Sequence, residues 1–185
     1  GNTYQHVFLE DEVTDVKWNF AVQSLLPNPS FEEDTVIKSN SGDRGLNGED
    51  GNFTKAWTGG QINRGPGKVM CYQHPMADGT YGIALFDHAT EDYTRLSCAF
   101  DLGGAGLYEL SFQICSRGND SQYYDGTTVS VAFDDAVEPL MTVRPTSPRD
   151  WDTCTCTVSL SAGSHTIAFR AKSGETSGTI IDNVI

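Results

Sequence analysis

A short acidic run follows an aromatic residue near the beginning of this 185-residue chain. In LLPNPSFEED, residues 25–34, Phe31 comes directly before Glu32, Glu33 and Asp34. Carboxylate oxygens are ligands for Ca²⁺, which takes about six to eight hard oxygens. The same run is also typical of solvated charge after a turn. Both interpretations stay open at this point, because a carboxylate ligand needs partners from elsewhere in the chain.

Acid pairs with the spacing for catalysis are scarce. Retaining glycoside hydrolysis uses two carboxyl groups roughly 5–5.5 Å apart, which favours acids at i and i+2 on a strand. Glu10 and Glu12 have this spacing but lack a surrounding strand pattern, and Asp134 and Asp135 are adjacent and would face opposite ways. The chain has no Gly-x-Ser-x-Gly elbow. We therefore expect no enzymatic activity.

The cysteines do not indicate a metal site or a complete disulfide set. Their number is odd, so at least one is free or pairs outside the chain. No C-x-x-C pair occurs and the histidines are isolated, which argues against zinc. Several cysteines fall in strand-like runs, where we expect small buried thiols. The five are Cys71, Cys98, Cys115, Cys154 and Cys156.

Length and charge exclude some classes of partner. The chain is long enough for one domain with a sizeable core. Its formal net charge is −13 and its pI about 4.5. This acidity argues against nucleic acid and against anionic membrane surfaces as partners. No run approaches the roughly 20 apolar residues of a spanning helix, so we expect no membrane insertion.

Most of the chain is predicted to be β-structure. Residues 1–24 form an N-terminal arm or linker, whose apolar residues fit either a strand or a short helix. From residue 25 onward, short apolar runs with period two alternate with turns rich in Gly, Pro and Asn. This pattern predicts an all-β sandwich or jelly roll of two antiparallel sheets over residues 25–185.

Alternation assigns side chains to the core. In residues 108–115, one face carries Tyr108, Leu110, Phe112 and Ile114, which we expect to be buried. In residues 153–160, the cysteines with Val158 and Leu160 form the apolar set, and the threonines point away. Ile167 and Phe169 are the expected core residues of the run at 165–171.

Several fragments together resemble a known family. LLPNPSFEE opens the domain, TRLSCAFDLGGAGLYELSFQICSR gives a strand, a Gly turn and a second strand, WDTCTCTVSLSAGSHTIAFRA gives two more strands, and GTIIDNVI closes it. In this order they resemble the galactose-binding-like jelly roll, and most closely carbohydrate-binding modules of families 4, 9, 16 and 22. The resemblance covers roughly residues 25–185.

The resemblance implies a structural calcium ion that bridges the first and last strands. Carried onto this sequence, its ligands would be the Glu32 carboxylate, the Asp182 carboxylate and backbone oxygens that include that of Ser30. The resemblance also places Phe31 inside the first strand, turned inward. Glu33 and Asp34 keep the interpretation of solvated charge.

The same resemblance implies sugar binding. Aromatic faces pack against sugar rings and polar groups pair with the hydroxyls. The candidates are Trp57, Tyr93, Gln113, Arg117, Tyr123 and Tyr124. Trp57 could equally be structural. Residues 134–150 lack an aromatic residue where some relatives carry one, which departs from the family pattern.

We expect a non-catalytic, monomeric carbohydrate-binding module for a polysaccharide or oligosaccharide. Its place would be extracellular, on the cell surface or in the periplasm, with an attached catalytic domain as a possible neighbour in a larger glycan-processing protein. The main alternative is a structural or protein-binding β-sandwich without sugar binding. A jelly-roll glycoside hydrolase or lyase is the least favoured alternative.

Overall fold

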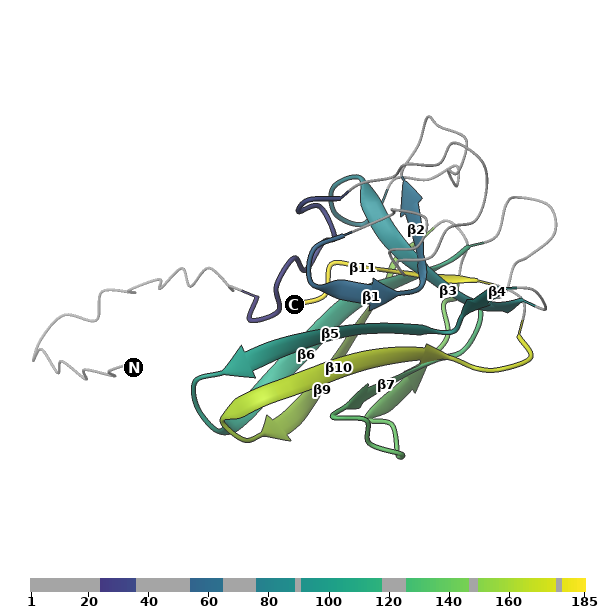
Figure 1. The fold of residues 1–185 in the computed structure, drawn as a ribbon. Coiled ribbons are helices and arrows are strands. Elements are labelled where there is room, and N and C mark those ends of the chain that lie inside the picture. The colour runs from purple at the N-terminus through teal and green to yellow at the C-terminus, as the bar shows by residue number, and fades with distance from the viewer. Residues whose placement is uncertain are drawn as a thin grey trace, which may run out of the picture.

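The computed structural model confirms the predicted all-β sandwich (Figure 1). It describes residues 24–35, 54–64, 76–88, 91–117, 126–146, 150–175 and 178–185. The predicted arm, apart from Ser24, therefore lies outside the described residues. Within the described ranges, no helix is long and apolar enough to span a membrane.

Two antiparallel sheets pack face to face, and each mixes strands from distant parts of the chain. The five-stranded sheet has the order β1 (Trp57–Gly59), β5 (Arg95–Leu102), β10 (Gly163–Ala171), β7 (Val129–Phe133) and β8 (Met141–Val143). Five strands of the six-stranded sheet have the order β2 (Gln61–Arg64), β3 (Tyr81–His88), β11 (Thr179–Asp182), β6 (Gly106–Ser116) and β9 (Asp152–Leu160). The sixth strand, β4 (Glu91–Tyr93), pairs with β3 outside this order.

The core follows the predicted alternation. Leu110, Phe112 and Ile114 of β6 are buried, as are Ile167 and Phe169 of β10. Tyr108, expected in the same set, is only half-buried because it lies near the beginning of β6. On β9 the threonines are exposed and the apolar set is half-buried. This strand lies at the edge of its sheet, so no neighbouring strand covers it on one side.

The segment 24–35 is not a strand, which corrects the sequence prediction. It consists of turns and bends, and Asn28, Phe31 and Asp34 have φ angles of 49°, 61° and 49°. Positive φ is incompatible with an extended strand. Phe31 nevertheless points inward, as predicted, and its side chain is fully buried. Its burial against the core offsets the unfavourable backbone conformation.

The two ends of the described chain lie side by side. The backbone N–H of Val184 donates to the carbonyl of Pro29 at 2.8 Å. The Ser24 hydroxyl donates to the carbonyl of Val184 at 3.4 Å. Beyond β11, Ile185 exchanges two backbone hydrogen bonds with Ser111 of β6. The opening segment is thus attached to the last strand and, through it, to the centre of the six-stranded sheet.

A buried histidine joins two loops at one end of the sandwich. His165 is 7% exposed, and its Nδ1 lies 2.7 Å from the Asp134 carboxylate, whereas Nε2 lies 3.0 Å from the Ser161 carbonyl. The hydrogen bonds to Asp134 and Ser161 raise the pKa of His165. The same pair lowers the pKa of Asp134. Doubly protonated imidazole can donate to both oxygens at once.

This pairing predicts a pH-dependent stability. Because the folded pKa of His165 is raised above 6.5, the stabilisation is complete below pH 6.5 and is lost as pH rises through the folded value. Thermal unfolding measured across neutral and mildly alkaline pH should show this loss. In the Asp134→Asn variant, the loss of stability with rising pH should be much smaller. Asp135→Asn is the control, since that carboxylate pairs with Arg95 and Arg170 instead. Identical pH profiles for the Asp134→Asn variant and the unmodified chain would contradict this explanation.

Candidate functional site

Glu32 holds a turn that is distant in sequence. Its Oε1 accepts the backbone N–H groups of Thr80 and Tyr81, each at 2.6 Å. Gly79, with φ +61°, lies so close that a Cβ there would be 2.5 Å from the Glu32 side chain. Glycine is therefore required at this position by both conformation and space.

Asp182 binds the same turn from the other end of the chain. Its Oδ2 accepts the backbone N–H of Asp78 at 2.9 Å, and its Oδ1 accepts that of Asn183 at 2.7 Å. The side chain is fully buried. Burial raises the pKa of Asp182 to about 7, against the opposing effect of these amide hydrogen bonds. We call Glu32, Asp182 and residues 77–81 the carboxylate clasp.

The neighbouring acids have a different role. Glu33 is exposed and pairs with the exposed Lys55 at 2.7 Å. Asp34 is also exposed, and Ser30 is half-buried beside Phe31. An exposed ion pair of this kind contributes little to stability. Glu32, Glu33 and Asp34 therefore have different surroundings, since Glu32 accepts backbone N–H groups and the other two are exposed.

The clasp has oxygen donors of the kind that calcium prefers, but they are few. Within the described ranges, no group of three or more His, Cys, Asp or Glu side chains is placed to hold a metal ion. The carboxylates of Glu32 and Asp182 instead accept backbone N–H groups. Residues 36–53 lie outside the described residues.

Arg117, which the sequence predicts for sugar binding, directly follows β6 at one end of the six-stranded sheet. Both β3 and β6 run antiparallel to β11, and β9 runs antiparallel to β6. The last residues of β3 and β6 therefore lie beside the first residues of β9. We call this the loop end; in Figure 1 it is the end near β4.

At the loop end, a cation lies on an aromatic ring. The guanidinium carbon of Arg117 is 4.1 Å from the ring centroid of Phe86. Phe86 belongs to a second apolar cluster with Met76, Ala84 and Ile180, against which Trp151 packs. Ile180 alternates with Ile181, which lies in the main core. The second cluster therefore covers the outer face of the six-stranded sheet.

In the sequence, the tyrosines predicted to bind sugar lie close to Phe86 or to Arg117. Tyr93 in β4 pairs in register with Phe86, although its side chain is not described. Tyr123 and Tyr124 lie outside the described residues, within the segment that follows Arg117. Their assignment to sugar binding stays a prediction.

Gln113 lies further along the same outer face. It is half-buried, and its Oε1 accepts the Asn183 side-chain N–H at 3.1 Å. In register, Gln113 is opposite Thr153 on β9 and Asp182 on β11. It therefore lies between the carboxylate clasp and the exposed threonines of β9.

Trp57 is a core residue, which corrects its assignment to sugar binding. It is 4% exposed, and its indole N–H lies 3.0 Å from the carbonyls of both Pro27 and Asn28. Its ring centroid lies 5.1 Å from that of Phe31 and 6.4 Å from that of Phe169. Both its ring and its polar group are occupied within the protein, so no face remains for a ligand.

Two residues at the loop end, Phe86 and Trp151, are not among those that the sequence predicts for sugar binding. A signal for Trp151 is its position directly before a strand-like run. Nothing in the sequence connects Phe86 with Arg117, because they meet only through the crossover order of the sheet.

Exposed aromatic surface is lacking on the described parts of both sheets. Every aromatic side chain whose exposure the structure describes is buried or half-buried. The outward positions of β5 and β10 hold small or charged residues, and Asp135 pairs there with Arg95 and Arg170 at 2.7 and 3.1 Å. Trp151, which packs against the second apolar cluster, is half-buried.

Comparisons with known proteins support the fold. No family model matches the sequence, and no curated protein matches it. A solved family 61 carbohydrate-binding module in complex with β-1,4-galactotriose matches with a TM-score of 0.51 at 17% identity, over 88% of this chain and 96% of that chain. This likeness confirms the jelly-roll β-sandwich, whereas membership of families 4, 9, 16 or 22 stays a prediction.

Two further matches are more distant. An isomalto-dextranase of Arthrobacter globiformis T6 in complex with panose has a TM-score of 0.49 at 17% identity, over 71% of this chain and 21% of that chain. This chain thus spans about a fifth of that enzyme. A family 36 module in complex with calcium and xylotriose has a TM-score of 0.44 at 15% identity, over 66% of this chain and 92% of that chain.

The contacts of the carboxylate clasp predict that Asp182→Asn destabilises the fold more than Glu33→Gln does. Asp182→Asn should reduce the free energy of unfolding by about 1–3 kcal/mol, because an amide keeps one oxygen where two backbone N–H groups need acceptors. Glu33→Gln should change it by no more than about 0.5 kcal/mol. Chemical denaturation of both variants measures the difference. Equal stability of the two variants would show that the clasp contributes nothing.

Proposed function

We propose that this chain is a non-catalytic carbohydrate-binding module that binds a polysaccharide or oligosaccharide at its loop end. The observation that carries the proposal is the stacking of Arg117 on Phe86 beside Trp151. A stacked guanidinium is held in one orientation, and its N–H groups can donate to hydroxyls. Tyr93, Tyr123 and Tyr124 would supply further aromatic surface from neighbouring segments, and Gln113 a further polar group.

A secreted or cell-surface location fits this function, with a larger glycan-processing protein as its context. The chemistry of the buried cysteine thiols is compatible with such a location. Burial raises the pKa of Cys98 to about 11 and that of Cys115 to about 12. The thiolate is the reactive form, so these two cysteines would resist oxidation without forming disulfides. We propose a monomer, as the sequence led us to expect.

One observation favours the alternative, a structural or protein-binding module. None of the aromatic side chains with described exposure forms an open platform on a sheet face. If the tyrosines of the loop end do not supply one, sugar binding would be absent. Binding to polysaccharides distinguishes the two functions.

Affinity electrophoresis against plant, algal and host polysaccharides, including a β-1,4-galactan, tests the proposal. The unmodified chain should be retarded by at least one of them. Arg117→Ala should weaken that binding roughly ten- to hundredfold, the range expected for hydrogen bonds to a charged group. Arg95→Ala, on the other sheet, is the matched control and should bind normally. Absence of retardation by every polysaccharide would favour the structural alternative.

We also propose that calcium binds at the carboxylate clasp, held by Glu32, Asp182 and the backbone oxygen of Ser30. A fully buried carboxylate is costly unless a positive charge compensates it, and amide N–H groups are the partners of Asp182 in the structure. Bound calcium would supply that charge and fix both chain ends to each other.

Calcium-dependent melting tests this second proposal. At a calcium concentration a hundred times the dissociation constant, the free energy of unfolding should rise by about 2.7 kcal/mol. EGTA should reverse the increase, and Asp182→Asn should abolish it. Magnesium is the control ion, because it requires a stricter octahedral geometry. A melting temperature that responds to neither calcium nor EGTA would exclude the site.

A further inference from the structure

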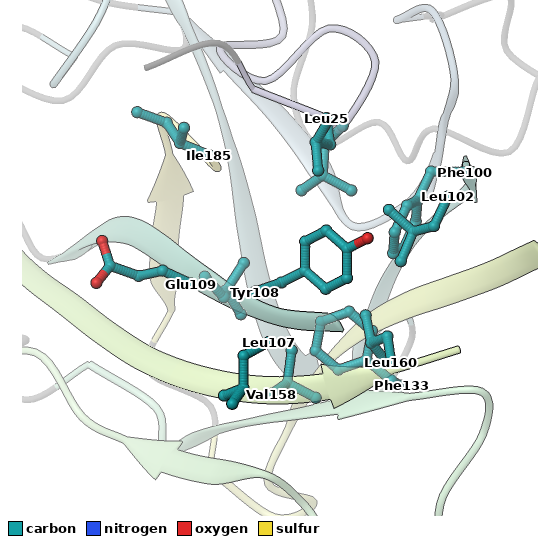
Figure 2. Close-up of a pocket in the computed structure, with 12 residues that line it drawn as sticks. Leu25, Phe100, Leu102, Leu107, Tyr108, Glu109, Phe133, Val158, Leu160 and Ile185 are labelled. Carbon is teal, nitrogen blue, oxygen red and sulfur yellow. The ribbon is translucent and has the colours of Figure 1, made fainter. Parts of the chain in front are cut away.

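An apolar pocket opens between the two sheets at the end opposite the loop end (Figure 2). Its volume is about 280 Å³. The walls include Phe100 and Leu102 of β5, Tyr108 and Leu110 of β6, and Leu160 of β9. An apolar cavity of about 150 Å³ accommodates benzene, so this pocket has room for a large aromatic side chain.

The lining offers almost nothing to a polar occupant. The Tyr108 hydroxyl, which Figure 2 shows among the apolar side chains, already donates to the carbonyl of Gly104. The carboxylate of Glu109 is exposed at the rim. Leu107 and Leu25 are 76% and 58% exposed and contribute apolar surface to the lining. The chemistry of the walls therefore selects an apolar occupant.

The pocket lies where the N-terminal segment joins the sandwich. Leu25 and Leu26 line it, and the described chain begins one residue earlier, at Ser24. Twenty-three residues precede that point, and residues 16–22 read VKWNFAV. In this stretch Val16, Trp18, Phe20 and Val22 alternate with Lys17, Asn19 and Ala21. If the stretch is extended, its four largest apolar side chains share one face.

We propose that residues 16–22 cover this pocket and insert apolar side chains, Trp18 or Phe20 foremost, between the two sheets. Eight residues lie between Val16 and Leu25, so the connection spans at most about 30 Å. Because Leu25 itself lines the pocket, the segment can reach it. A tethered segment has an effective concentration in the millimolar range, which favours it over a separate apolar ligand. The pairing would bury two apolar surfaces at once. This proposal is independent of sugar binding.

Substitutions on the two faces of the segment, made in the full chain, test the proposal. Trp18→Ser and Phe20→Ser should each lower the melting temperature by roughly 5–10 °C, through lost apolar burial. Each should also open the pocket to the neutral dye N-phenyl-1-naphthylamine, seen as increased fluorescence. Lys17→Ser and Asn19→Ser are the matched controls and should change neither quantity.

A substitution in the pocket provides an independent check. If the Leu107 side chain is exposed in the full chain, Leu107→Ser should leave the melting temperature nearly unchanged. If residues 16–22 cover that side chain, the substitution should lower the melting temperature. In the double variant with Trp18→Ser, the two decreases in melting temperature should not add. Additive effects, strong dye binding by the unmodified chain, or equal effects on both faces of the segment would overturn the proposal.

Discussion

Two carboxylates from opposite ends of the chain hold one turn, and the arrangement of the sandwich depends on this contact. Glu32 and Asp182 accept N–H groups from residues 78–81, which lead directly into β3. The same contact positions the opening segment, so that Trp57 can donate to the carbonyls of Pro27 and Asn28. One set of polar interactions thus fixes the first segment, the last strand and the beginning of a central strand.

The strands with clear alternation could be predicted from sequence, because every second side chain of a half-buried strand faces the core and is apolar. Leu110, Phe112, Ile114, Ile167 and Phe169 are examples. The turns of the opening segment could not be predicted, since the positive φ of Phe31 depends on tertiary packing that local sequence does not encode. Trp57 was ambiguous for a related reason: an indole suits both a sugar and a core, and its acceptors lie about thirty residues away.

The candidate site was predictable in its parts but not in its assembly. Arg117 and Tyr93 were identified as residue types able to recognise sugars. The contact of Arg117 with Phe86 follows from the order β3-β11-β6-β9, which places β11 between two strands that come earlier in the chain. The partners of Glu32 were equally hidden, because they are backbone N–H groups and leave no side-chain signature.

The central claim is that carbohydrate binds at the loop end. Amide chemical-shift mapping during titration with an oligosaccharide tests it most directly, using a fragment of whichever polysaccharide retards the chain. The account predicts that the largest shifts fall on Phe86, Arg117 and Trp151, with the outward positions of β5 and β10 unchanged. Shifts centred on β5 and β10, or no shifts with any oligosaccharide, would contradict it.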